Sequence, residues 1–405
     1  MKIAIVDPSA YTPPYDHALC AALGSLGEEV ELLTSRFPYG PTPPADGYRR
    51  REIFYQRAHA AAATGPRSLA RLGLKLAEHV PGMLRCRRIA GAADVAHYQW
   101  LPVQPLDVRL LPGGARRTGR DAARGGPRLV LTAHDVMPRE PRPGQLRAQR
   151  RLYRRFDAIV VHSEHGRQRL IVELGVPAER VHTIPHGAFA HLAAAATPPP
   201  GIDAAAARAD AAAARSGPTD STPGPGAANG APVVLFFGLL RPYKGLDLLL
   251  AAWRQLAAEE RRGAELWIAG MPRMSLDGLD LDQESVRVVP RFITDAEIPA
   301  FFGAAEIVVL PYREIDQSGV LFTALAFGKP LLLSDVGGFP EIAATGAAQI
   351  FPAGDVEALR GSLARMLADE SLRARMASAA RAAAGGPYAW ETVATAHRAL
   401  YRSLF

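Results

Sequence analysis

Two cations follow a strongly apolar stretch in the second half of the sequence. The run VVLFF at 233–237 leads into Gly238, and Arg241 and Lys244 come before a helical pattern that begins near 246. An arginine guanidinium holds two phosphate oxygens as a fork, and a lysine adds a compact point charge. Only four of the 47 basic residues are lysines, which makes a lysine here notable. The pattern predicts a diphosphate-binding loop, and the alternative is a surface loop with solvated cations.

A second stretch of the same half offers backbone amides. We predict a strand over Ile307–Leu310, then a polar loop, then a helix that opens at Ser318 and Gly319. Free N–H groups at the start of a helix bind anions. Turns that follow parallel strands share one edge of the sheet. We therefore predict that the amides of Ser318, Gly319 and Val320 join Arg241 in one nucleotide-diphosphate pocket.

The first half contributes a histidine and two candidate contacts for a second substrate. His134 follows the predicted strand Arg128–Thr132 in the sequence TAHD. A lone histidine after a strand is more often packed or solvated than catalytic. Trp100 and His17 are candidates for the acceptor side of a site, with core packing as the alternative.

Composition and missing motifs exclude several classes of protein. The chain has 405 residues, of which 48% are hydrophobic and 21% charged, so it can fill two cores. Cys20 and Cys86 are too few for a disulfide framework or a zinc cluster and fit a reducing, cytoplasmic setting. No run approaches the ~20 apolar residues of a membrane-spanning helix. We find no G-x-G-x-x-G after the first strand, no P-loop, no H-E-x-x-H and no G-x-S-x-G, so we expect no metal and no cofactor.

Short apolar runs alternate with helical patterns in both halves, which predicts two parallel α/β domains. The strands expected are Lys2–Val6, Val30–Thr34, Asp94–Tyr98, Arg128–Thr132, Ala158–His162, Arg180–Ile184, Val233–Phe237, Glu265–Ala269, Val286–Val289, Ile307–Leu310 and Leu331–Ser334. Helices are expected at about 15–26, 66–83, 144–155, 164–174, 246–259, 294–303, 318–327, 355–368 and 389–403.

A break in composition divides the chain. Residues 191–232 are almost all Ala, Pro, Gly, Ser and Thr, which predicts a linker or a disordered insertion. We therefore expect an acceptor-binding Rossmann-like domain over 1–190, a donor-binding Rossmann-like domain over 233–388, and a C-terminal helix over 389–405 that packs back toward the N-terminal domain.

The order of these motifs resembles one enzyme family. FGLLRPYKG, LWIAG, VVPRFITDAEIPAFFGAAEIVVLPY, SGVLFTALAFGKP and DVGGFPE are similar to the donor domain of retaining GT-B glycosyltransferases of family 4, and the N-terminal half follows the same family order. The resemblance implies two Rossmann-like doubly wound domains that face a central cleft. It also implies a catalytic His134 opposite the anomeric carbon of the donor, and Arg241 and Lys244 on the donor diphosphate.

One departure from the family pattern concerns a pair of glutamates around the donor helix. The corresponding positions here are Ile315 and Thr323, with Glu314 and Asp316 beside the first. In the family the second glutamate holds the nucleotide ribose, whereas Thr323 can make a single uncharged hydrogen bond. Glu314, Asp316 and Thr323 are therefore the candidates for the sugar and ribose contacts.

The resemblance implies metal-independent transfer of a sugar from a nucleotide-diphospho-sugar to an acceptor hydroxyl with retention, in polysaccharide, glycolipid or other glycoconjugate synthesis. The acceptor stays unknown, and lipid-linked acceptors occur in the family. The alternatives are a non-catalytic nucleotide-sugar-binding scaffold, which the missing glutamates suggest, and a GT-B-type epimerase.

The charge of the chain is uneven, with +11 over residues 1–190 and −4 over 191–405. Residues 68–88 mix apolar and basic side chains, as an interfacial helix does. This pattern predicts a peripheral contact with the inner face of a membrane, and the alternative is that the apolar face packs on the sheet. The sequence contains no module that combines aromatic and basic residues, so a nucleic-acid-binding protein is disfavoured.

Overall fold

The computed structural model describes residues 1–60, 69–112, 126–137, 144–194 and 231–405. The chain divides into two compact units, which are Met1–Gly187 with Trp390–Phe405, and Ala188–Ala389. We call these unit 1 and unit 2. The linker predicted over 191–232 lies mostly outside the described residues, and its first residues belong to the short helix α7 (Ala190–Ala194).

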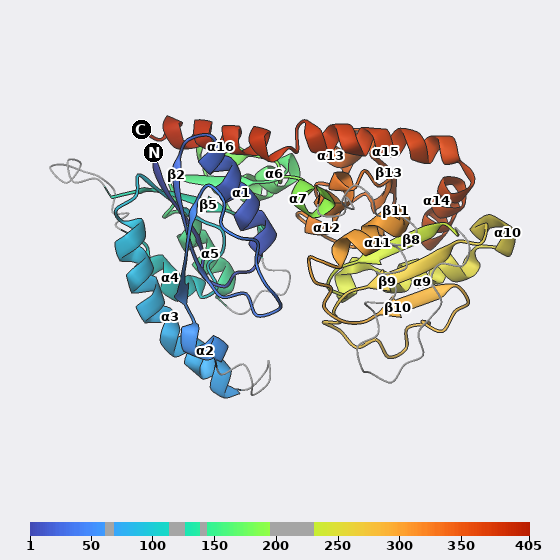
Figure 1. Ribbon diagram of the computed structural model, residues 1–405, viewed down its shortest axis with the longest axis horizontal. Helices are drawn as coiled ribbons and strands as arrows, with labels where there is room; N and C mark the ends of the chain where they lie inside the picture. The colour runs from blue at the N-terminus through green and yellow to red at the C-terminus, as the bar shows by residue number, and fades with distance from the viewer. Residues whose placement is uncertain (61–68, 113–125, 138–143, 195–230) are drawn as a thin grey trace, which may run out of the picture. The chain divides into compact units, whose positions relative to one another are not determined.

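Unit 1 is built on a seven-stranded parallel sheet (Figure 1). The strand order is β3-β2-β1-β4-β5-β6-β7, so the order reverses between β1 and β4. In such doubly wound sheets ligands bind beyond the carboxyl ends of the strands at the reversal. The strands are β1 (Lys2–Asp7), β2 (Glu29–Ser35), β3 (Arg49–Phe54), β4 (Val95–Tyr98), β5 (Arg128–Thr132), β6 (Ala158–Val161) and β7 (Val181–Thr183).

The helices of unit 1 include one from the far end of the sequence. Helix α16 (Trp390–Ser403) packs against α1 (Pro13–Ser25), and the two run side by side in Figure 1. Its buried side chains include Trp390 and Tyr401, so the last helix belongs to the core of unit 1. The other helices are α2 (Gln56–Ala60), α3 (Leu69–Ala90), α4 (Gln104–Leu110), α5 (Gln145–Tyr153) and α6 (Glu164–Val172).

Unit 2 contains a six-stranded parallel sheet with the order β10-β9-β8-β11-β12-β13. Its strands are β8 (Val233–Phe237), β9 (Glu265–Ala269), β10 (Val286–Val289), β11 (Ala305–Leu310), β12 (Leu331–Ser334) and β13 (Ala348–Phe351). Its further helices are α9 (Leu246–Gln255), α10 (Ala258–Arg261), α11 (Ile298–Ala304), α12 (Gly319–Ala326), α13 (Phe339–Ala343), α14 (Val356–Ala368) and α15 (Glu370–Gly385).

The central strands of both sheets are mostly apolar and buried, as in sheets that helices cover on both faces. Every residue of β8 is buried, and so is every residue of β12. Trp253 of α9 is completely buried in the core of unit 2, beside strand residues such as Phe236. These rigid sheets fix the positions of the loops that leave their carboxyl ends.

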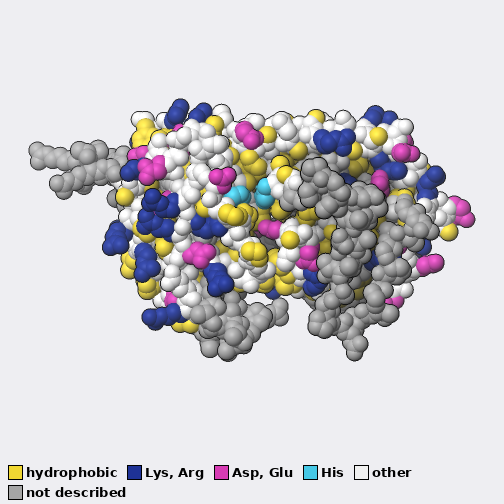
Figure 2. Space-filling view, viewed as in Figure 1, with side chains coloured by type: hydrophobic (Ala, Val, Ile, Leu, Met, Phe, Trp, Pro, Cys, Tyr) yellow, Lys and Arg dark blue, Asp and Glu magenta, His cyan; other side chains and the backbone are white. Residues whose placement is uncertain are grey.

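The structure adds elements that the sequence pattern does not predict, among them the strands β3 and β13 and the helices α2, α4, α13 and α15. Both added strands lie at sheet edges, and β3 is the sequence RRREIF, in which the Arg49 and Arg51 side chains form ion pairs with Glu31. Helix α3 begins at Leu69 and continues to Ala90, beyond the predicted end at 83. Figure 2 shows Lys and Arg side chains gathered on the visible face of unit 1.

Candidate functional site

The candidate donor site of unit 2 lies on three neighbouring strands. Strands β8, β11 and β12 are adjacent in the sheet. The loop after β8 carries Arg241 and Lys244, and the loop after β11 carries Ser318. Residues Pro242–Lys244 form a 3-10 turn after Arg241, whose backbone is extended. Because the strands are parallel, all three loops leave the same edge of the sheet. The structure thus places these predicted residues on one edge.

The two cations of this edge have different surroundings. Lys244 is only 7% exposed, and its ammonium lies 5.2 Å from the centre of the Tyr312 ring. Arg241 is partly exposed; its backbone carbonyl accepts a hydrogen bond of 3.0 Å from the Lys244 amide, and its guanidinium makes no hydrogen bond or ion pair to a described residue. An unpaired guanidinium beside a buried ammonium favours an anionic ligand, which both groups can neutralise.

Tyr312 connects the two predicted halves of the donor site. Its ring is fully buried against Lys244, and its hydroxyl lies 3.4 Å from the Ser318 hydroxyl. Its backbone carbonyl accepts a 2.6 Å hydrogen bond from Ser334 at the end of β12. Sequence reasoning missed Tyr312, and the available signal was an aromatic residue directly after a buried strand in LPY.

Two glycines hold the loops together by close backbone contact. Gly245 has φ +68° and Gly337 has φ +58°, a region that favours glycine. A Cβ atom at Gly245 would overlap the carbonyl oxygen of Pro311, and one at Gly337 would overlap that of Ile315. The loops after β8 and β12 therefore both pack against the loop after β11, which fixes the shape of the site.

The helix predicted to open at Ser318 and Gly319 is α12, which begins at Gly319. Ser318 is the N-cap, and its side chain caps none of the amides of the first turn, while its own N–H donates to Gln317 Oε1 at 3.2 Å. Helix α12 begins at Gly319, and Val320 follows it. The Ser318 N–H is thereby engaged, whereas the N–H groups of Gly319 and Val320 meet no hydrogen-bond acceptor among the described residues and can bind an anion.

The candidates for the ribose and sugar contacts lie in three different settings. Glu314 is exposed and lines a pocket of about 640 Å³, together with Asp247 and Arg313. Asp316 is buried. The Thr323 hydroxyl donates to the Gly319 carbonyl at 3.0 Å, inside its own helix.

An ion pair closes part of that pocket. Arg313 binds both carboxylate oxygens of Asp247, at 2.8 and 2.6 Å, and holds the pKa of Asp247 below its usual range. Ile315, at the position of the first family glutamate, is buried and carries no polar group. Thr323 stands at the position of the second glutamate, and α12, with the sequence GVLFTALA, carries no carboxylate.

His134 of unit 1 lies at the carboxyl end of β5, in a cluster of rings. The indole of Trp100 stacks on it with centroids 4.9 Å apart and an angle of 12°, and the Tyr15 ring meets it edge-on at 4.8 Å. Its Nε2 lies 3.0 Å from Gln99 Oε1, and its Nδ1 lies 3.2 Å from His162 Nε2. The structure thus brings the predicted residues His134 and Trp100 together.

The hydrogen bonds of this cluster fix the protons on its imidazoles. His162 Nδ1 lies 3.0 Å from the Ile184 carbonyl, which only accepts, so His162 carries its proton there. His162 Nε2 then accepts a proton from Nδ1 of His134. A neutral His134 consequently accepts at Nε2, which requires the amide of Gln99 to present its NH2 group at this position.

Burial keeps these histidines neutral. It lowers the pKa of His134 and of His186 well below the usual range, and neighbouring histidines lower both further. Burial lowers the pKa of His162 to about 4. His134 therefore faces its surroundings as a neutral imidazole at pH 7. Sequence reasoning missed the partner His162, although it follows a buried strand in VVHSE.

The loop after β1 is held by a buried carboxylate. Asp7 accepts hydrogen bonds from the backbone amides of Ser9 at 3.0 Å and Tyr11 at 2.6 Å. Burial and the neighbouring Asp7 raise the pKa of Asp16 well above its usual range. This loop also bears Thr12, which accepts a hydrogen bond of 3.3 Å from the Trp100 indole.

His17 takes a different place from the other acceptor-side candidate. Its Nδ1 lies 3.1 Å from the Tyr48 hydroxyl, whereas Trp100 stacks on His134. Burial, with help from Arg50, lowers the pKa of His17. The structure thus places His17 beside Tyr48, on helix α1.

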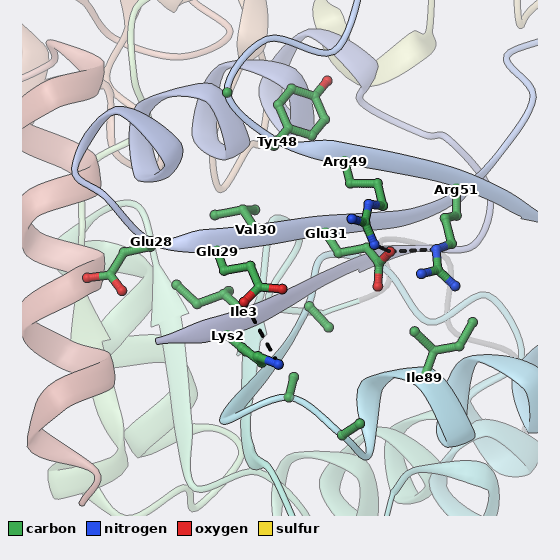
Figure 3. A pocket seen from close by; sticks show the side chains of 14 residues that line it. Lys2, Ile3, Glu28, Glu29, Val30, Glu31, Tyr48, Arg49, Arg51 and Ile89 are labelled. Atoms are coloured by element: carbon green, nitrogen blue, oxygen red, sulfur yellow. Dashed lines mark ion pairs between the residues drawn. The ribbon is translucent and has the colours of Figure 1, made fainter.

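Unit 1 also has a pocket of about 650 Å³ at the amino ends of its strands, across the sheet from the edge that carries His134 (Figure 3). Its charged side chains neutralise one another. Lys2 lies 3.9 Å from Glu29, and Arg49 and Arg51 converge on Glu31, as Figure 3 shows. With its charges paired internally, this pocket is a weaker candidate than the carboxyl edge.

Two negative findings apply to the described part of the chain. No group of three or more His, Cys, Asp or Glu side chains there has an arrangement that could hold a metal ion. None of the described helices is both long and apolar enough to cross a membrane.

Two parallel-sheet α/β units, with candidate sites at the carboxyl edges of their strands, define a GT-B glycosyltransferase fold. The chain belongs to the glycosyl transferases of group 1. Residues 231–369 match that family description, and residues 14–187 match the description "glycosyl transferase 4-like domain".

Individual relatives agree with this family. The D-inositol 3-phosphate glycosyltransferase of Xylanimonas cellulosilytica is 26% identical over 95% of this chain and 89% of its own. Among solved structures, sucrose-phosphate synthase of Thermosynechococcus elongatus has a TM-score of 0.70 at 20% identity, over 100% of this chain and 99% of its own. HepE of Anabaena, solved in complex with UDP-glucose, has a TM-score of 0.67 at 19% identity over 100% of both chains.

Proposed function

We propose that this glycosyltransferase moves a sugar from a nucleotide-diphospho-sugar to an acceptor hydroxyl, with retention at the anomeric carbon. The observation that carries the proposal is one loop that holds the buried Lys244 and Arg241, whose guanidinium has no partner among the described residues, and that is joined through Tyr312 to the start of α12. The complex of HepE with UDP-glucose is in line with such a donor.

In this reaction the bond between the anomeric carbon and the diphosphate oxygen breaks. The bond between the acceptor oxygen and the anomeric carbon forms on the same face, and the proton of the acceptor hydroxyl goes to the departing phosphate. Arg241 and Lys244 stabilise the charge that develops on that phosphate. Because these cations do the work that a metal does in other enzymes, we propose that transfer needs no divalent metal. We assign His134 to the transfer step.

A donor panel tests the assignment. The full chain is mixed with UDP-, GDP-, ADP- and TDP-sugars, with and without magnesium, and its melting temperature and the release of nucleoside diphosphate are measured. One donor at ~100 Kd should stabilise the native state by about 2.7 kcal/mol. Stabilisation without any turnover would favour the alternative of a nucleotide-sugar-binding scaffold.

We also propose peripheral contact with an anionic membrane, because α3 carries apolar and basic side chains on its exposed face. Its buried side includes Met83 and Cys86, which pack in the core of unit 1. Leu76 and Leu84 remain 56% and 49% exposed, and Arg85, Arg87 and Arg88 are exposed beside them. A basic helix with outward leucines fits the headgroup region of a bilayer, where a lipid-linked acceptor would also lie.

Vesicle flotation tests the membrane proposal. The chain should float with vesicles rich in phosphatidylserine at low salt and be released by salt, since each arginine contributes about 1 kcal/mol near the surface. Replacing Leu76 and Leu84 by serine should weaken flotation. The same change at Val172, which is 75% exposed on α6, is the control. A wild-type chain that stays with the soluble fraction at low salt contradicts the proposal.

A further inference from the structure

Two aromatic side chains meet where the strand order of unit 1 reverses. Tyr11 lies in the loop after β1 and Trp100 in the loop after β4, and these two strands are neighbours in the sheet. Their ring centroids are 4.7 Å apart, and the rings are tilted by 39°. Ligands of doubly wound sheets bind at the reversal, so this pair lies at the ligand-binding point of the fold.

The pair extends the ring cluster of His134 outward. Trp100 stacks on His134 with centroids 4.9 Å apart, and Tyr11 packs against Trp100 in turn. Exposure rises along this series, because His134 and Trp100 are partly buried whereas Tyr11 is 59% exposed. The outer ring of the stack is therefore open to a ligand from solution.

The loop after β1 holds Tyr11 in this exposed position. The buried Asp7 carboxylate accepts a hydrogen bond of 2.6 Å from the Tyr11 amide. The Trp100 indole donates to the Thr12 hydroxyl at 3.3 Å. Ala10 has φ +47°, a left-handed conformation that is costly for a residue with a Cβ atom and that recurs at ligand-binding sites. A ring held in this way loses little conformational entropy when a ligand binds.

The chemistry of the stack favours a sugar ring as the ligand. An aromatic face carries partial negative charge, which attracts the C–H groups on one face of a pyranose while the pyranose hydroxyls stay in water. A single exposed apolar side chain needs no explanation, but Tyr11 belongs to a stack that leads to His134. A lipid chain would need a wider apolar surface, whereas the sequence neighbours of the stack include the polar Thr12 and Asp135.

We infer that Tyr11 and Trp100 bind a sugar ring of the acceptor by stacking on its C–H face. Because Tyr11 lies one ring further out from His134 than Trp100, it contacts a part of the acceptor remote from the reacting hydroxyl. Such a contact stabilises the ground state and the transition state alike, so Tyr11 lowers the KM of the acceptor without raising kcat. This inference rests on the proposed function, because it names the acceptor class of the same site.

Two measurements on the full chain separate this inference from the proposed function. Saturation-transfer NMR reports the binding of a sugar probe without any turnover. Release of nucleoside diphosphate, from the donor that the panel selects, reports transfer and gives KM and kcat for the same probe. The probes are methyl glucoside, methyl mannoside, maltose and octyl glucoside, of which the last adds an alkyl chain.

We expect at least one of the three probes without an alkyl chain to receive saturation on its ring protons. Tyr11→Ala should weaken this signal and raise the KM for that probe about threefold to tenfold, the range for one lost aromatic contact, while kcat changes less than twofold. Tyr11→Phe keeps the ring and should behave like the wild type. Since Tyr11 is exposed, both variants should fold.

Phe405→Ala is the matched control. The Phe405 ring is 70% exposed and lies beside Arg128, the first residue of β5, at the amino edge of the same sheet. Its removal should leave the NMR signal and the acceptor KM unchanged. An equal loss in Phe405→Ala would mean that any exposed ring binds these probes, which overturns the inference.

The inference is also overturned if the wild-type chain binds none of the probes, or if Tyr11→Ala changes neither binding nor KM. The same holds if Tyr11→Phe loses as much as Tyr11→Ala, or if kcat falls at constant KM. An effect of Tyr11→Ala on octyl glucoside alone would mean that the rings hold an alkyl chain instead of a sugar. Sugar binding that depends on Tyr11, without release of nucleoside diphosphate from any donor, would contradict the proposed function and leave the sugar site in place.

Discussion

At the scale of single residues, the two cations after β8 have separate tasks. Lys244 is buried against Tyr312 and cannot leave the site, whereas Arg241 has no described partner and remains free to grip a ligand. A phosphate that both contact would be bound by charge-assisted hydrogen bonds, which are stronger than neutral ones.

We predict that Arg241→Ala and Lys244→Ala each weaken donor binding by about 1.5–3 kcal/mol, or roughly tenfold to 150-fold in Kd. Calorimetric titration with the donor measures the effect. Lys2→Ala and Arg254→Ala are the matched controls, because both side chains lie in exposed ion pairs away from this loop. Wild-type affinity in both site variants would remove the diphosphate assignment.

A second prediction concerns His162 as a positioning residue for His134. His162→Phe removes the group that accepts the His134 Nδ1 proton, and we expect kcat to fall about tenfold while the donor KM changes less than twofold. His162→Gln keeps an acceptor near the same place and should recover part of the rate. If kcat and the donor KM change by the same factor, or if the two variants behave alike, His162 acts only in packing.

At the scale of elements, the donor site is fixed by the close approach of loops. Gly245 and Gly263 can be compared directly, because their backbones have nearly the same φ angle, +68° and +73°. A Cβ atom at Gly245 would overlap Pro311, whereas one at Gly263 has no neighbour within 4 Å.

Gly263→Ala should therefore cost only the backbone strain, about 1 kcal/mol. Gly245→Ala should cost that strain plus displacement of the loop after β11, and it should also weaken donor binding. Chemical denaturation and donor titration of both variants measure the two effects. If the two variants lose equal stability and keep equal affinity, the close contact does not shape the site.

Sequence patterns predicted the central strands well because those strands are buried on both faces and read as continuous apolar runs, as in VVLFF of β8. They missed β3 because an edge strand needs no apolar run, and RRREIF has three arginines in its first half. Lys244 was found through its spacing from Arg241. His162 and Tyr312 were missed because their contacts with His134 and Lys244 join residues that lie far apart in the sequence.

At the scale of the whole molecule, buried histidines couple stability to pH. Burial lowers the pKa of His162 and His397 to about 4 and that of His97, His134 and His186 below the usual range. Unfolded histidine titrates near pH ~6.5, so between that pH and about 4 the unfolded chain binds protons that the native chain does not. The free energy of unfolding must therefore fall as pH falls through this window. The raised pKa of Asp16 acts in the opposite direction, because protonation of Asp16 raises the free energy of unfolding as pH falls.

We predict a clear drop in melting temperature between pH 7 and pH 5, to which a histidine with a pKa near 4 contributes on the order of 2 kcal/mol. His397→Gln should reduce the dependence of the unfolding free energy on pH by the contribution of one histidine. His165→Gln, at an exposed position of α6, should leave the dependence as it is. If the native state is equally stable at pH 5 and pH 7, the buried histidines do not stay neutral in the native state as we expect.

The most direct test of the central claim is the stereochemistry of the reaction. The full chain is incubated in excess EDTA with the donor that the panel selects and an acceptor that stimulates release of nucleoside diphosphate, and proton NMR follows the anomeric signal. We predict that an α-configured donor yields an α-linked product together with one equivalent of nucleoside diphosphate. A β-linked product, isomerisation of the sugar without any acceptor, or donor binding without turnover would each contradict the account.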